Sequence, residues 1–238
     1  MTACFTRTDV RTSEPSGEGL QIESPVMADF HRLSVRQEAL STEQLCELQS
    51  RWMGPTGLFA KLARQVTEQG RQAPLLSDLA RLRDTQRQAM AEKAVQFTLG
   101  LHLRREMVAN PFSGLQREYL ACVVFDDLAP RTLVERYAAS AALRHRDGDY
   151  FSKLIATTRN TVERRIVFHG LLEHYDSLLP VERSVYPADY RAAQQRHLDD
   201  QEAAYGKLVL DRPVSELIKR YTPQRLLAKL GCIPRGAS

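Results

Sequence analysis

The chain has 238 residues, of which 43% are hydrophobic, and its 33 basic and 29 acidic side chains give a net charge of +4. The length fits one large domain or two small ones. An ordinary apolar content and a small net charge exclude a chain that is disordered throughout, and the composition excludes collagen-like, mucin-like and fibrous coiled-coil proteins.

The cysteines and the apolar segments indicate the cellular compartment that we expect for the protein. Four cysteines lie far apart in the sequence, with no C-x-x-C motif and no zinc-ribbon spacing: Cys4, Cys46, Cys122 and Cys232. This pattern predicts unpaired thiols in a reducing compartment. Residues 1–19 contain no apolar stretch typical of a signal peptide, and the longest apolar candidate, residues 94–103, is too short to span a membrane. We therefore expect a cytoplasmic protein without a membrane partner.

Arginine is unusually frequent, with 27 arginines against 6 lysines, alongside 31 leucines and 25 alanines. All three frequent residues are favoured by GC-rich codons. We therefore interpret the excess as the mark of a GC-rich bacterial genome, although an arginine-rich surface can also indicate nucleic acid binding.

The N-terminal half is expected to be helical after a disordered tail. Residues 1–25 are rich in Thr, Ser, Glu and Gly, which is typical of a disordered segment. Residues 26–110 are predicted to form an N-terminal helical block, in which a capping box at residues 41–44 opens one helix. Residues 75–108 are predicted to form one long helix, because nothing in the polar stretch 83–88 breaks a helix.

Asn110–Pro111 is the predicted boundary to a C-terminal helical bundle, residues 111–206, because proline pushes the residue before it out of the helical region. Further capping boxes are expected at residues 113–116 and 132–135. The apolar run 119–125 could be a helix or a buried strand, and the lack of a partner strand favours the helix. The helix after Thr132 is expected to end at a turn over residues 147–149.

Two amphipathic segments follow in this bundle. Residues 161–179 place apolar side chains at helical spacing, and a second helix is expected from Pro187 to Gly206. Because every predicted element is a helix joined by short turns, the sequence predicts an all-α protein with a bundle-like arrangement.

Motifs for chemistry are weak. The chain has neither a Gly-rich phosphate-binding motif nor a G-x-S-x-G nucleophile motif. His169, Glu173 and Asp176 share one helical face and form a weak metal candidate, but such a trio is more often an ordinary surface face. We therefore expect no metal, no cofactor and no catalytic residue. All eight tyrosines follow residue 110, and they could pack the core or line a Tyr/Arg pocket.

Residues 207–238 form a short basic tail, and its last 28 residues carry six basic and two acidic side chains. Two short helices are expected there. Their cations could bind nucleic acid as a helix-turn-helix-like element: Lys219, Arg220, Arg225 and Lys229. Their apolar residues could instead dock onto a protein partner: Leu217, Ile218, Leu226, Leu227 and Leu230. Both hypotheses fail if the tail packs on its own bundle.

Three functions follow from these observations. We expect first a non-catalytic regulatory or adaptor protein that acts through protein–protein interaction. The alternatives are a nucleic-acid-binding regulator that uses the basic tail, and an enzyme with a Tyr/Arg/His/Glu pocket in the C-terminal bundle. The sequence leaves the oligomeric state and the identity of the partner open.

Overall fold

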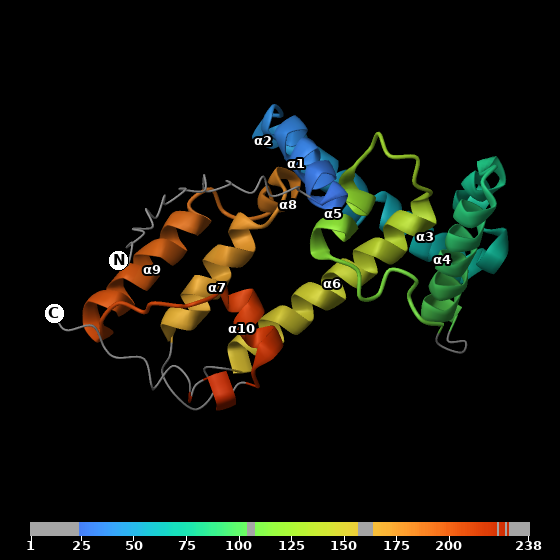
Figure 1. The fold of residues 1–238 in the computed structure, drawn as a ribbon. Coiled ribbons are helices and arrows are strands. Elements are labelled where there is room, and N and C mark those ends of the chain that lie inside the picture. Colours follow the sequence, from blue (N-terminus) through green and yellow to red (C-terminus); the bar gives the residue numbers. More distant parts are fainter. Residues whose placement is uncertain (1–23, 104–107, 157–163, 223, 227, 229–238) are drawn as a thin grey trace, which may run out of the picture.

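A computed structural model describes residues 24–103, 108–156, 164–222, 224–226 and 228 of the chain. Every regular element in these ranges is helical, which confirms the all-α class (Figure 1). The expected disordered tail lies outside the described residues up to position 23.

The helices follow one another with short connections. In chain order they are α1 (Pro25–Glu38), α2 (Thr42–Met53), α3 (Leu58–Gln69), the 3-10 helices η1 (Gly70–Gln72) and η2 (Pro74–Arg81), α4 (Thr85–Leu103), α5 (Arg117–Phe125), α6 (Leu133–Ala156), α7 (Arg164–Asp176), α8 (Pro180–Arg183), α9 (Tyr190–Tyr205) and α10 (Val214–Arg220).

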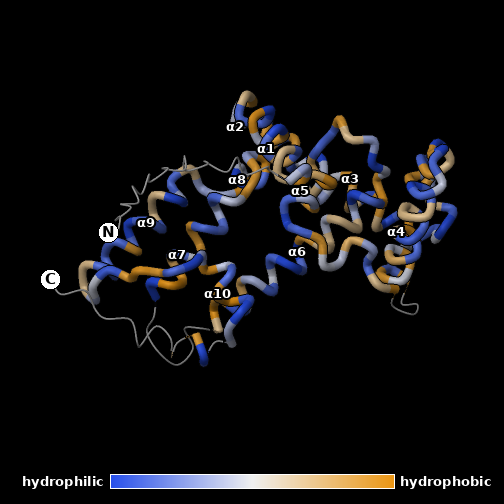
Figure 2. The backbone as a smooth tube through the Cα atoms, viewed as in Figure 1, coloured by the Kyte–Doolittle hydropathy of each residue, from blue (hydrophilic) through white to orange (hydrophobic). Residues whose placement is uncertain are grey.

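Helix α6 joins two groups of helices. Figure 1 shows α1 to α5 gathered around its N-terminal half, and α7, α9 and α10 lying toward its C-terminal end. Its 24 residues give it a length of about 36 Å at 1.5 Å per residue. Figure 2 shows polar and apolar residues alternating along most helices, as expected for helices that bury one face.

The larger apolar core surrounds the N-terminal half of α6. It combines residues of α1 to α4 with α5, with Val134 to Leu143 on α6 and with Leu179 and Val181 near α8. This core therefore contains residues on both sides of Asn110–Pro111. The division into domains at that point stays a prediction.

The smaller core lies at the other end of α6. It contains Leu154 of α6 and Ile166 of α7, together with five residues of the tail: Leu208, Val214, Leu217, Ile218 and Leu226. The described part of the tail is thus packed onto α6 and α7 of the same chain. A helix of seven residues gains its stability from such packing, because so short a helix is marginal alone.

The predicted long helix over residues 75–108 is wrong. The structure has η2, then a break at residues 82–84, then α4. Asp84 accounts for the break, because its side chain accepts the backbone N–H of Arg87 at 2.7 Å and so caps the start of α4. The Gln88 side chain also donates to the Leu82 carbonyl at 2.6 Å. Capping of this kind competes with a continuous helix.

Other local predictions had mixed outcomes. The capping boxes at Ser41 and Thr132 are confirmed, and residues 119–125 are helical. The capping box at residues 113–116 is wrong, since α5 follows Gln116 without a side-chain cap. The turn at residues 147–149 is also wrong, because α6 continues through it. Glycine within a helix costs only about 1 kcal/mol, so Gly148 does not end α6.

Candidate functional site

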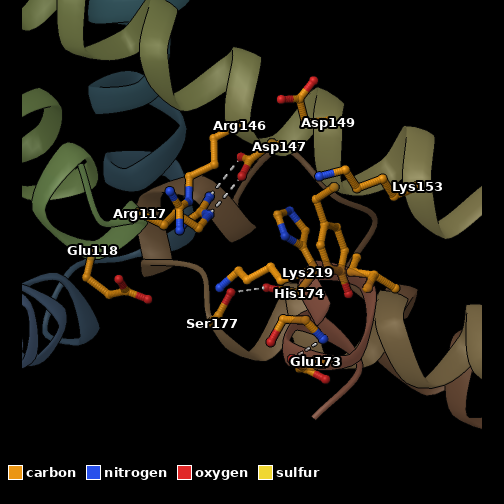
Figure 3. Close-up of a pocket in the computed structure, with 13 residues that line it drawn as sticks. Arg117, Glu118, Arg146, Asp147, Asp149, Lys153, Glu173, His174, Ser177 and Lys219 are labelled. Atoms are coloured by element: carbon orange, nitrogen blue, oxygen red, sulfur yellow. Dashed lines mark hydrogen bonds and ion pairs between the residues drawn. The ribbon is translucent and has the colours of Figure 1, made fainter. Parts of the chain in front are cut away.

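Helices α5, α6, α7 and α10 surround a pocket of about 510 Å³ (Figure 3). The volume falls in the usual range for small-molecule sites, roughly 300–1,000 Å³. Charged and polar side chains from all four helices line it, together with Ile218.

Helix α6 contributes one face to this pocket. Arg146, Tyr150 and Lys153 all line it, and their spacing of four and then three residues places them on one side of a helix. This stripe exists only because α6 runs through residues 147–149. The spacing of these residues along one helix is the sequence signal that could have identified them as one face. The predicted turn at residues 147–149 divided this face between two elements, so the signal was missed.

Arg117 fixes one end of the pocket. This residue is 8% exposed, and its guanidinium donates to both carboxylate oxygens of Asp147 at 3.0 and 3.1 Å and to those of Glu182 at 2.7 and 3.2 Å. Burial alone lowers the pKa of Arg117, but the carboxylates of Glu182 and Asp147 outweigh this effect and raise it. The network ties α5, α6 and α8 together, and it gives the Asp147 carboxylate on the pocket wall an ion-pair partner within the protein.

Tyr150 and His174 form an aromatic part of the wall. Their rings stack with centroids 5.6 Å apart, and the Tyr150 hydroxyl donates to the Gly170 carbonyl at 2.8 Å. A Cβ at Gly170 would lie only 2.7 Å from Leu154 Cδ1 and 3.0 Å from the Tyr150 hydroxyl. Glycine therefore allows the close approach of α6 and α7 that positions Tyr150. Burial lowers the pKa of His174, although the Asp147 carboxylate opposes this, so His174 is neutral near pH 7.

Helix α10 forms the opposite wall. Both carboxylate oxygens of Glu173 on α7 accept backbone N–H groups at its start, from Val214 at 2.7 Å and from Ser215 at 3.1 Å. This contact caps the helix and places Lys219 at the pocket. The carboxylate of Glu173, like that of Asp147, thus already has hydrogen-bond partners within the protein.

Three cations on the pocket wall have no carboxylate partner among the described residues: Arg146, Lys153 and Lys219. Arg146 makes one hydrogen bond, to the Leu115 carbonyl at 3.0 Å. The two remaining acidic side chains, Glu118 and Asp149, lie at the outer edge of the labelled group in Figure 3. Asp149 lies 3.6 Å from His145. The pocket lining therefore includes three cations without a carboxylate partner among the described residues, and such cations can bind an anion.

The hydrogen bonds at this pocket do not pair a nucleophile with a base. The Ser177 hydroxyl donates to the His174 backbone carbonyl at 2.7 Å, away from the imidazole. The Tyr150 hydroxyl is bound to Gly170, and burial raises its pKa. Nucleophilic catalysis needs a hydroxyl within hydrogen-bond reach of a base. The pocket does contain the residue types of the enzyme hypothesis, with His174 as its histidine, whereas His169 does not line it.

The weak metal candidate is not assembled. His169 lies 3.5 Å from Glu202, and Glu173 caps α10. Asp176 accepts hydrogen bonds from Nε and Nη2 of Arg191 at 2.7 and 2.8 Å. Within the described ranges no cluster of three His, Cys, Asp or Glu side chains could hold a metal ion. The three residues therefore serve three separate contacts.

The apolar residues of the tail are mostly covered. Leu217 is 2% exposed, Ile218 6% and Leu226 0%, whereas Leu227 and Leu230 lie outside the described residues. The described part of the tail packs on the chain's own helices, which is the case in which both tail hypotheses were expected to fail. Docking through these side chains stays a prediction, and it requires α10 to leave the smaller core.

The basic residues of the tail do not form one described surface. Lys219 faces the pocket, Arg220 lies over the Tyr221 ring at 5.9 Å, and Arg225 is exposed at the start of the next turn. Lys229 lies outside the described residues. Nucleic acid binding by these four cations stays a prediction.

Comparisons with protein families, curated proteins and solved structures found no match to this chain. Over the ranges that the structure describes, no helix combines the length and apolarity needed to cross a bilayer.

Proposed function

We propose that this protein is a non-catalytic regulatory protein that binds a small organic anion in the pocket between α5, α6, α7 and α10. One observation carries the proposal: Arg146, Lys153 and Lys219 line a pocket in which the carboxylates of Asp147 and Glu173 are already bound. An anion would give these cations the partners that they lack.

The form of the site favours a small molecule over a polymer. Charge-assisted hydrogen bonds are roughly twice as strong as neutral ones, so a small anion that accepts from several of these cations at once binds more tightly than a neutral molecule would. Duplex DNA needs a basic surface that follows its phosphates. The pocket is concave instead, and of the three expected tail cations among the described residues, Lys219 lines it whereas Arg220 and Arg225 do not.

We further propose a cytoplasmic location. Cys46 and Cys122 are free thiols, and free cysteines suit a reducing compartment. Burial raises the pKa of the Cys122 thiol to about 12, so this residue is an unreactive apolar filler.

The test is thermal unfolding of the full chain with a panel of organic anions at matched ionic strength. A ligand that binds the folded state stabilises it, by about 2.7 kcal/mol at one hundred times Kd. We expect at least one anion to raise Tm in the wild-type chain and to lose this effect in the double variant Lys153→Ala/Lys219→Ala.

The matched control is Lys61→Ala, which removes an exposed cation on α3 outside the pocket. It should keep the full Tm increase. Equal increases in the double variant and the wild type would refute the site, and the lack of any increase with the panel would refute the proposal. Tight, strongly salt-dependent binding of duplex DNA that requires Arg220 and Arg225 would favour the nucleic acid alternative.

A further inference from the structure

The two uncommitted cations on α6 lie at separate places along the pocket. Arg146 and Lys153 are seven positions apart on one helix face, which is about 10 Å along the helix axis. Figure 3 shows them reaching in from opposite sides of the His174 ring. Their backbone positions are thus farther apart than the width of a compact anion.

One of these cations is held in place. Arg146 donates to the Leu115 carbonyl at 3.0 Å, which leaves other guanidinium N–H groups for a ligand, since arginine has five donors. Lys153 makes no ion pair or hydrogen bond to the described residues, and it is exposed at the rim of the pocket. The two cations therefore form two recognition points, the first anchored and the second adjustable.

The wall between these two points carries the Asp149 carboxylate beside an uncharged surface formed by three side chains: Tyr150, His174 and Ile218. Tyr150 lies between them on the same face of α6 and stacks on the neutral His174 ring. Ile218 lines the pocket from α10. This uncharged surface suits an uncharged segment of a ligand, because a charged group placed there would lose solvation without gaining a partner.

We propose that the ligand class is an extended dianion: an organic molecule with an anionic group at each end and an uncharged middle. This inference rests on the proposed function. One anionic group binds Arg146, the other binds Lys153, and the middle lies over Tyr150 and Ile218. Lys219 adds a contact from α10, so the ligand also links α10 to α6.

Binding of a series of straight-chain α,ω-dicarboxylates, from succinate to dodecanedioate, tests the distance between the two anion-binding points. Each dicarboxylate is compared with the monocarboxylate of the same chain length, by calorimetric titration of the full chain at constant ionic strength. We expect affinity to pass through a maximum at an intermediate length. At that length the dicarboxylate should bind at least about tenfold more tightly than its monocarboxylate, because each charged hydrogen bond contributes a factor of this size.

Single-residue variants test whether Arg146 and Lys153 bind the two anionic groups of the ligand. Lys153→Ala should abolish the length maximum and reduce the dicarboxylate to the affinity of the monocarboxylate, and Arg146→Ala should do the same. The exposed-cation control Lys61→Ala should bind like the wild type. Lys153 is exposed, so its replacement should leave Tm without ligand unchanged, and any loss of binding then reports on contact with the ligand.

The results of these titrations distinguish the proposed ligand class from the proposed anion-binding function of the pocket. Equal affinities for dicarboxylates and monocarboxylates, or tightest binding of a compact anion such as pyrophosphate, would overturn the ligand class and leave the anion pocket in place. A length maximum that survives Lys153→Ala would also overturn it. Failure of every anion, compact or extended, to bind would overturn the pocket function itself.

Discussion

Leu217→Ala tests whether the basic tail belongs to the fold. Leu217 on α10 is 2% exposed and packs in the smaller core with Leu154 and Ile166. Replacing a buried leucine by alanine costs about 2–5 kcal/mol, the lost transfer free energy plus the cost of the cavity. For a protein of this size each kcal/mol lowers Tm by about 2–4 °C, so we expect a decrease of several degrees.

The assay is thermal unfolding followed by circular dichroism, beside a control leucine. Leu128 is 72% exposed, and its replacement by alanine should change stability by no more than about 0.5 kcal/mol. If Leu217→Ala unfolds at the temperature of Leu128→Ala, α10 does not pack on α6 and α7 in solution. The tail would then be free to act as the docking segment that the sequence suggested.

Two further predictions concern buried charges. Burial raises the pKa of Asp78, a shift that its hydrogen bond from the Leu133 N–H only partly opposes. A raised folded-state pKa means that ionised Asp78 destabilises the fold near neutral pH and that this cost disappears as pH falls. Asp78→Asn should therefore stabilise the protein against urea near neutral pH. It should give no gain below the ordinary aspartate pKa of about 3.9, and a gain that is independent of pH would contradict this reasoning. Arg117→Ala should cost about 3–5 kcal/mol, because it leaves the Asp147 and Glu182 carboxylates without their cation. The neutral triple variant Arg117→Met/Asp147→Asn/Glu182→Gln should recover much of that loss in the same urea assay, and a triple variant less stable than Arg117→Ala would refute it.

The sequence by itself determined the fold class and several helix boundaries. Capping boxes at Ser41 and Thr132 are local signals, because the residues that bond to each other lie three positions apart. The amphipathic spacing of residues 164–176 likewise depends only on neighbours along one helix. Such signals act within one turn of a helix, so they can be recognised without knowing what packs against it.

The tertiary structure alone decided where helices continue and where the pocket lies. Asp147 and Gly148 have the composition of a turn, yet α6 passes through them, and Asp147 there meets Arg117, which lies 30 positions away. Arg117 also binds Glu182, 65 positions away. Contacts over such separations depend on how helices pack, and no local pattern encodes that packing. The pocket therefore emerges only when α5, α6, α7 and α10 are brought together by their apolar faces.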